Sequence, residues 1–224
     1  MREVVLDTET TGLSPEEGHR IIEIACIELT NHLPSGRTFH SFFNPEREVE
    51  FSATEIHGLK TADLVGMPLF KQKASEFLAF IAEDPLVIHN AQFDINFLNA
   101  ELDRVELPRL DFNRAIDTLT LARKKFPGAP ASLDALCRRF SVDNSARDKH
   151  NALLDVDLLA QVYIELIGGR QPDLRLSSVA SEEQEVSQPT RQIERHWPPH
   201  APSADEREEH ARLIAKLTNP LWIA

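Results

Sequence analysis

The sequence predicts an α/β fold: a mixed five-stranded sheet flanked by helices and followed by a flexible C-terminal tail. Two observations predict the sheet. Strand-like runs with short connections open the chain, and strand-like runs then alternate with helical patterns as far as Gly168-Gly169. Short connections join antiparallel neighbours, whereas strand-helix-strand order produces parallel pairs. A third observation predicts the tail, because residues 171 to 224 hold six of the 14 prolines and no glycine.

The first three strands should form an antiparallel meander. Their apolar runs extend over Glu3 to Asp7, Arg20 to Leu29 and Thr38 to Phe43. Apolar residues then recur at helical spacing from Leu69 to Ile81, which predicts an amphipathic helix. The next apolar run, Leu86 to Ile88, is short and predicts a buried strand. This part of the chain therefore supplies the meander and the first parallel strand.

The second half of the predicted domain consists of helices around one further strand. The predicted elements are a helix from about Gln92 to Val105, a weak strand from Ala115 to Asp117, short helices over Leu119 to Phe126 and Ser132 to Phe140, and a helix from Asn151 to Ile167 that ends in a Gly-Gly cap. Helices that connect parallel strands cover the faces of a sheet. We therefore expect a layered domain over residues 1 to 170.

Length and composition limit the class of protein. The 224 residues leave room for one domain and an appendage, and 42% hydrophobic with 27% charged residues is close to the globular average, which excludes wholesale disorder. No apolar run is long enough to span a bilayer, and the N-terminal residues lack the apolar segment of a signal peptide. We therefore expect a cytoplasmic protein with no membrane partner, whose distant cysteines, Cys26 and Cys137, are buried thiols.

The net charge argues against one kind of nucleic-acid protein. The chain has 36 acidic and 24 basic residues, a net charge of −12, which excludes nucleic-acid binding by bulk electrostatic attraction. It does not exclude a nucleic-acid enzyme, because acidic residues that hold divalent metal ions turn local repulsion of phosphate into attraction. The positions of the acidic residues therefore matter more than their total.

The first acidic pair lies at the end of the first predicted strand. Residues 7 to 12 read Asp-Thr-Glu-Thr-Thr-Gly, and alternation along a strand places Asp7 and Glu9 on the same face. Two such carboxylates repel each other, and a hard divalent cation with oxygen preferences would stabilise both ionised forms. Ordinary turn chemistry of Asp-Thr before glycine is the alternative interpretation of this segment.

Two further segments place an acidic residue near the start of a predicted helix. Asp94 falls in the first turn of the helix after the strand Leu86 to Ile88, where the helix dipole alone would explain it. Asp155 lies a little over one turn beyond His150, among apolar neighbours, where an uncompensated carboxylate is costly. His150, taken alone, is a polar residue at a helix start.

Together the four carboxylates and the histidine resemble the motifs of the DnaQ-like, or DEDD, exonuclease family in its histidine-bearing DEDDh subclass. The motifs here are Asp7-Thr-Glu9, His89-Asn-Ala-Gln-Phe-Asp94 and His150-Asn-Ala-Leu-Leu-Asp155. Residues 115 to 128, 132 to 137 and 143 to 145 are similar to the epsilon-type, proofreading branch of that family in bacterial DNA polymerase III. The resemblance covers roughly residues 1 to 170, and Asn151 stands where the family often has a small residue.

The resemblance implies a ribonuclease H-like fold and 3′-to-5′ exonucleolysis with two divalent metal ions, Mg²⁺ or Mn²⁺. In that mechanism Asp7, Glu9 and Asp155 ligate one ion, and Asp7 bridges to the second. Asp94 assists through a bound water, and His150 is the general base. Independently of the family, an imidazole with a pKa of about 6.5 suits proton removal near neutral pH, and paired metal ions suit in-line attack on a phosphodiester.

The resemblance also implies a substrate and a partner. The substrate is the single-stranded 3′ end of DNA, and the terminal nucleotide is expected to contact Asp7, Glu9, Thr10, His57 and Asp155. The partner is the alpha catalytic subunit of DNA polymerase III, for which the chain would remove mismatched 3′-terminal nucleotides.

The tail is expected to bind partners. Residues 171 to 202 predict a flexible linker, because the stretch is rich in Ser, Gln, Glu and Pro and lacks hydrophobic periodicity. Its start, Gln171 to Leu176, resembles peptides that bind bacterial sliding clamps, which makes the clamp a second candidate partner. Residues 203 to 224 begin with a capping-box pattern, Ser203 to Glu206, and carry an apolar stripe that suits a groove on the polymerase. Packing of this segment on its own domain is the alternative.

The motifs leave two other functions open. A free-standing 3′-to-5′ exonuclease for single-stranded DNA or RNA would share them, because they do not distinguish DNA from RNA, and only the tail separates it from a polymerase subunit. A non-catalytic tethering module that has kept the fold is disfavoured, because all four carboxylates and His150 are present.

Overall fold

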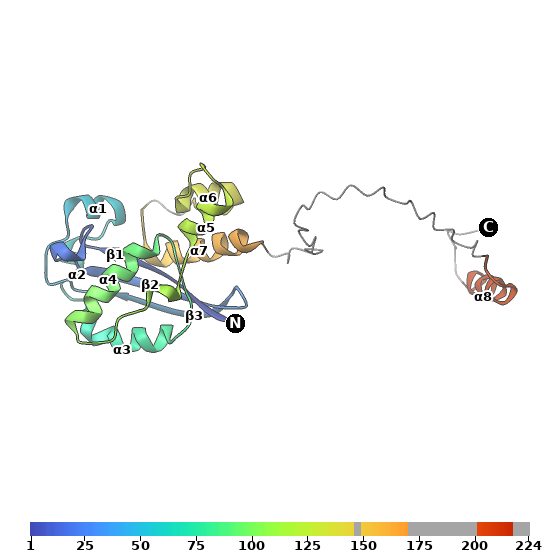
Figure 1. The fold of residues 1–224 in the computed structure, drawn as a ribbon, viewed down its shortest axis with the longest axis horizontal. Helices are drawn as coiled ribbons and strands as arrows, with labels where there is room; N and C mark the ends of the chain where they lie inside the picture. Colours follow the sequence, from blue (N-terminus) through green and yellow to red (C-terminus); the bar gives the residue numbers. More distant parts are fainter. Residues whose placement is uncertain (146–148, 170–200, 217–224) are drawn as a thin grey trace, which may run out of the picture. The chain divides into compact units, whose positions relative to one another are not determined.

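A computed structural model describes residues 1–145, 149–169 and 201–216 (Figure 1). The chain divides into two units, Met1–Arg175 and Leu176–Ala224, and the sheet belongs to the first. The clamp-like peptide, Gln171 to Leu176, and almost all of the predicted linker lie outside the described residues. Across the described ranges, no helix combines the length and the apolar character needed to cross a membrane.

The first unit is built on a mixed five-stranded sheet in the order β3-β2-β1-β4-β5, which confirms the predicted fold class. The strands are β1 (Arg2–Thr10), β2 (Ile21–Thr30), β3 (Leu33–Phe42), β4 (Leu86–Ile88) and β5 (Ala115–Asp117). β2 pairs antiparallel with both β1 and β3, whereas β4 pairs parallel with β1 and β5. The central strand β1 therefore joins the meander to the parallel part of the sheet.

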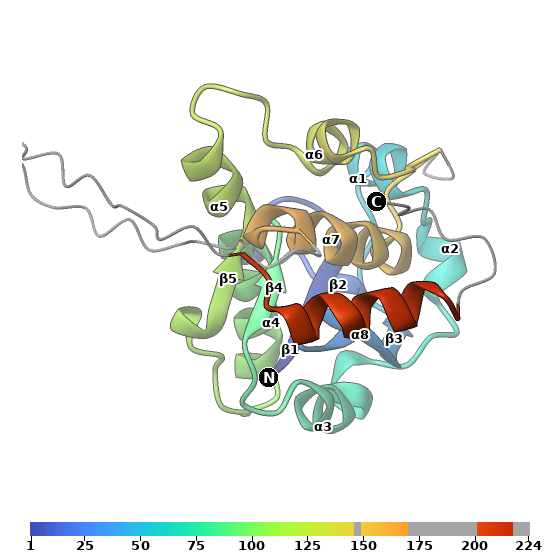
Figure 2. The ribbon, with the colours of Figure 1, turned by 90° about the vertical axis from the view of Figure 1, so that its right-hand side faces the viewer.

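Helices cover both faces of this sheet (Figure 2). The helices are α1 (Phe51–His57), α2 (Thr61–Leu64), α3 (Phe70–Ile81), α4 (Ala91–Arg104), α5 (Thr118–Lys125), α6 (Leu133–Phe140) and α7 (Ala152–Ile167), with short 3₁₀ turns η1 (Pro15–Glu17) and η2 (Phe112–Arg114). One buried core joins α3 and α4 to Val4 and Leu6 of β1, and the other joins α5, α6 and α7 to Val5. Successive residues of β1 thus face opposite cores, as strand alternation requires.

The structure differs from the sequence-based expectation mainly in the boundaries of the meander. β1 continues to Thr10 instead of ending at Asp7, because its pairing with β2 extends that far. β3 begins at Leu33 instead of Thr38, because Asn31 and His32 have φ values of 51° and 66° and form the tight turn that twisted hairpins favour. The short helices α1 and α2 were not predicted at all.

The ends of α7 agree with the prediction. Asn151 is its N-cap and accepts a hydrogen bond from the Leu154 amide at 3.1 Å. Gly168 and Gly169 close the helix with positive φ values of 129° and 71°, which glycine adopts without steric penalty. Cys26 and Cys137 are free and buried, as expected.

The second unit contains one described helix, α8 (Ala204–Ile214). Its start is the predicted capping box: the Ser203 hydroxyl accepts from the Glu206 amide at 3.2 Å, and the Glu206 carboxylate accepts from the Ser203 amide at 2.8 Å. An ion pair between Glu208 and Arg212, 2.7 Å apart, adds one turn of helix-surface support. These local interactions explain why this segment is helical.

Candidate active site

β1 carries two of the expected site residues, Asp7 and Glu9, near its C-terminal end. In the antiparallel register they lie opposite Ala25 and Glu23 of β2, so both project to the side of the sheet that α7 covers. Thr8 between them projects to the opposite side, where its hydroxyl donates to Asp94 Oδ1 at 2.7 Å. β1 thus directs Asp7 and Glu9 to one side of the sheet, and Thr8 on its other side binds Asp94.

Asp94 reaches the site from the first turn of α4. The helix starts after β4 at Asn90, which has a left-handed φ of 67° and whose backbone amide donates to Asp117 Oδ1 at 3.0 Å. The same oxygen accepts from the Leu119 amide at 3.0 Å, so one carboxylate at the end of β5 caps two chain segments. Asp94 itself is only 3% exposed and is directed toward β1.

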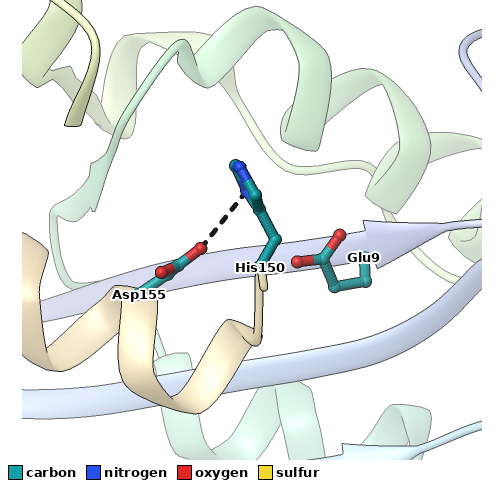
Figure 3. A group of neighbouring side chains, drawn as sticks. All are labelled: Glu9, His150 and Asp155. Carbon is teal, nitrogen blue, oxygen red and sulfur yellow. Dashed lines mark ion pairs between the residues drawn. The ribbon is translucent and has the colours of Figure 1, made fainter. Parts of the chain in front are cut away.

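Asp155 and His150 come from the start of α7. Asp155 is 3% exposed and lies in the first turn, and the His150 ring is about half exposed. His150 Nδ1 lies 3.5 Å from Asp155 Oδ2, and Figure 3 shows Glu9 on the strand beside this pair. The histidine's backbone amide donates to the Ile56 carbonyl at 3.1 Å, which ties the segment before α7 to α1.

These side chains share one cleft of about 350 Å³. Its walls comprise Asp7, Thr8, Glu9, His89, Asn90, Phe93, Asp94, Ser132, Leu133, Asp134, His150 and Asp155. Glu9, His150 and Asp155 each offer a ligand atom within 4.8 Å of the others, which makes them a candidate metal group. Since Asp7 and Asp94 add further carboxylate oxygens, the donor set suits a hard divalent cation.

The electrostatics of the cleft support the same fit. Burial raises the pKa of Asp7 well above its ordinary value, and repulsion from Asp94, Glu9 and Asp155 raises it further. Burial also raises the pKa of Asp94 to about 7, although the hydrogen bond from Thr8 opposes the shift. A divalent cation stabilises the ionised form of carboxyls whose pKa is raised in its absence. The residues present therefore fit a metal site.

The two expected nucleotide contacts from outside this group lie beside the cleft, not among the residues that line it. The Thr10 hydroxyl donates to the Gly12 carbonyl at 2.7 Å. His57, at the end of α1, is buried, and its Nδ1 accepts from the Leu59 amide at 3.1 Å. Burial lowers the pKa of His57, with smaller contributions from His150 and Lys149 in the same direction, so all three side chains are neighbours.

Sequence reasoning missed several residues of the cleft wall. Ser132 is the N-cap of α6, and its hydroxyl accepts from the Ala135 amide at 3.3 Å. Asp134 follows it and accepts from Asn144 at 3.2 Å. The Ser-x-Asp pattern predicts a helix start but carries no sign that this start reaches Asp155, which depends on how α6 packs on α7.

Comparison with known proteins identifies the family. Residues 4–163 match the family described as Exonuclease. The DNA polymerase III subunit epsilon of Rickettsia felis is 46% identical over 222 residues, which cover 97% of each chain. The protein of that name from Escherichia coli is 44% identical over 176 residues, 75% of this chain and 72% of that one.

Solved structures confirm the ribonuclease H-like fold. Exonuclease X in complex with 5′ overhanging duplex DNA has a TM-score of 0.58 and 25% identity, covering 74% of this chain and 90% of that one. The nuclease domain of 3′hExo, a DEDDh family member bound to rAMP, has a TM-score of 0.63 and 20% identity over 74% and 91% of the two chains. Family match, full-length relatives and site geometry agree, and the chain therefore belongs to the exonuclease family and, within it, to the epsilon subunits of DNA polymerase III.

Proposed function

We propose that this proofreading subunit removes nucleotides from the 3′ end of DNA with two divalent metal ions, Mg²⁺ or Mn²⁺. The observation that carries the proposal is the convergence of four carboxylates and His150, from β1, α4 and the start of α7, on one cleft. The Rickettsia felis relative, similar over 97% of the chain, supports the assignment to a replicative polymerase. That similarity does not favour the free-standing exonuclease.

The metal ions are proposed to be held by Asp7, Glu9, Asp94 and Asp155. Three of these side chains are almost fully buried, and Asp7 is partly so, which places their oxygens in surroundings with little competing water. When bound, the ions supply positive charge against the scissile phosphate and lower the pKa of a water molecule. The carboxylates themselves fix where that charge can lie, because β1 and two helices hold them from different directions.

His150 is proposed to accept the proton of the attacking water as general base. Its ring is about half exposed at the cleft, which leaves it accessible to substrate, and Asp155 Oδ2 is 3.5 Å from its Nδ1. A carboxylate in that position stabilises the imidazolium that forms when the ring takes the proton. The hydrogen bond from its backbone amide to the Ile56 carbonyl fixes the main chain of His150 while the ring accepts the proton.

The terminal nucleotide is proposed to contact Thr10 and His57 in addition to Asp7, Glu9 and Asp155. The proposed protein partner is the alpha catalytic subunit of DNA polymerase III, bound through residues 203–224, and the Gln171 to Leu176 peptide makes a sliding clamp the second candidate. The support is that several relatives that share the whole chain are named subunits of this polymerase.

The decisive experiment is digestion of a 3′-mismatched primer-template, a matched one and an RNA oligomer with Mg²⁺ or Mn²⁺. We expect the wild-type chain to shorten the mismatched DNA fastest from its 3′ end, and Asp7→Ala to abolish cleavage while leaving the circular dichroism spectrum unchanged. Retained activity in Asp7→Ala would refute the site assignment. A preference for RNA would instead support the free-standing exonuclease.

A further inference from the structure

A fifth carboxylate, Glu23, lies behind the proposed metal site. It belongs to β2 and stands directly opposite Glu9 of β1, on the face that α7 covers. Its side chain is 1% exposed. Like charges directly opposite each other in a sheet are destabilising. A buried carboxylate at this position therefore needs stabilising contacts.

The contacts of Glu23 lead from β3 to the start of α7. His40 Nε2 of β3 donates to Glu23 Oε1 at 2.7 Å. Glu23 Oε2 is buried and makes no hydrogen bond with any residue in the described part of the chain. Ala25, two positions along β2 on the same face, belongs to the same buried core as Ala152 and Val156 at the start of α7, so Glu23 faces this end of the helix. In agreement, the Ala152 amide lowers and the charge of Asp155 raises the pKa of the Glu23 carboxyl, although burial is the largest cause of its raised pKa. A carboxylate there is also favoured by the helix dipole.

We propose that Glu23 is a positioning residue that holds the start of α7 at a fixed distance from β1, and thereby sets Asp155 and His150 relative to Glu9. The inference rests on the proposed metal-dependent function of these three residues. His40 orients the carboxylate from behind, and the oriented side chain supports the start of α7. Partners of this kind, which orient metal ligands without touching the metal, typically change metal affinity or activity 10- to 100-fold when removed.

The chain offers a matched control at the other end of α7. Glu3 of β1 is 0% exposed and accepts hydrogen bonds from His32 Nδ1 and from the Tyr163 hydroxyl, each at 2.6 Å. It is therefore also a buried carboxylate that a histidine orients against α7. Glu3 lies at the opposite end of β1 from Glu9, so its removal disturbs the same helix without reaching the cleft.

The test compares Glu23→Ala with Glu3→Ala in the full chain. We measure Mn²⁺ affinity by calorimetry without DNA, kcat and KM on a mismatched primer-template, and the thermal midpoint. We expect both variants to lower the midpoint, and only Glu23→Ala to weaken Mn²⁺ binding and reduce kcat by about tenfold, with KM within about twofold of wild type. Glu23→Gln, which keeps the size of the side chain and an oxygen for His40 Nε2, should retain most of the Mn²⁺ affinity.

Should Glu23→Ala fail to fold, His40→Ala provides the same comparison, and Glu23→Gln remains the conservative variant beside it. His40→Ala frees the carboxylate from its orienting contact, and we expect it to weaken Mn²⁺ binding in the same direction. Wild-type Mn²⁺ affinity and kcat in Glu23→Ala or in His40→Ala, or equal losses in Glu3→Ala, would overturn the inference while leaving the proposed function intact. A wild-type chain that binds no Mn²⁺ and digests no DNA would overturn the proposed function itself.

Discussion

Asp94 links the stability of the protein to the occupancy of its cleft. Burial raises its pKa from an ordinary 3.8 to about 7 in the absence of a cation. A carboxyl whose pKa is higher in the folded than in the unfolded state binds its proton more tightly when folded. Its stabilising contribution is therefore present at low pH and is lost as the pH rises from about 3.8 through about 7.

Asp94→Asn should remove this pH dependence. The amide oxygen can still accept the hydrogen bond from Thr8, and the side chain no longer has to ionise. In EDTA at pH 8 we expect the variant to have a free energy of unfolding higher than wild type by at most about 4 kcal/mol, since each pKa unit between 3.8 and about 7 corresponds to ~1.4 kcal/mol. At pH 4 the two proteins should be nearly equal.

Urea unfolding of both proteins at pH 4 and pH 8 checks this expectation, with and without Mn²⁺. Saturating Mn²⁺ should stabilise the wild type more than Asp94→Asn, because a cation that binds only the folded state adds stability by mass action. A variant less stable than wild type at pH 8 in EDTA would show that the pKa of Asp94 is not raised in the folded protein.

Among individual residues, the sequence predicts those that a short local pattern identifies. Asp7 and Glu9 are two positions apart on one strand, and alternation alone places them on one face. Glu23 could not be found in this way, because its proximity to Glu9 depends on the register of β2 against β1. The Ile56 carbonyl is likewise invisible to sequence reasoning, since every residue has one.

Among the elements, α1 holds in place the segment that carries His150, the proposed general base. The helix ends at Gly58, which has a left-handed φ of 82° and whose amide bonds to the Thr54 carbonyl. A Cβ at Gly58 would lie 2.9 Å from Lys149 Cδ, so the Lys149 side chain lies directly over this glycine. With the backbone bond from His150 to Ile56, the end of α1 forms a dock for residues 149–150.

Gly58→Ala should therefore reduce catalysis more than it reduces stability. Gly128 is the matched control, because its φ of 75° is equally left-handed and a Cβ there has nothing within 4 Å. Each substitution should lower stability by about 1 kcal/mol through backbone strain. Only Gly58→Ala should lower kcat, by about tenfold, since it displaces the side chain of Lys149, the residue next to His150. Equal kcat values for the two variants would refute the claim that the end of α1 positions His150.

Sequence reasoning predicted the long elements and missed this dock for a physical reason. α3, α4 and α7 bury one face over several turns, and their apolar spacing is visible. α1 has seven residues and α2 four, too few for a periodic pattern to appear. Such short helices are stabilised by their tertiary contacts more than by their own sequence.

For the whole molecule, the buried cores of the described residues are confined to the exonuclease unit. Both buried cores consist of residues between Val4 and Leu166, one on each face of the sheet. The expected site residues all lie in the same unit. The second unit adds α8, whose capping box and ion pair are local to that helix. The two units should therefore be separable by truncation.

Deletion of residues 203–224 should leave exonuclease activity on a mismatched primer-template within about twofold of wild type and abolish co-purification with the polymerase alpha subunit. The physical reason is that Leu213 and Ile214, adjacent on α8, offer an apolar surface that coupled folding on a partner would bury. In the full chain, Leu213→Asp with Ile214→Asp should reproduce the loss, whereas Arg207→Ala on the same helix should not. If the truncated chain still co-purifies with the polymerase, the contact must lie within residues 1–202 and not on α8.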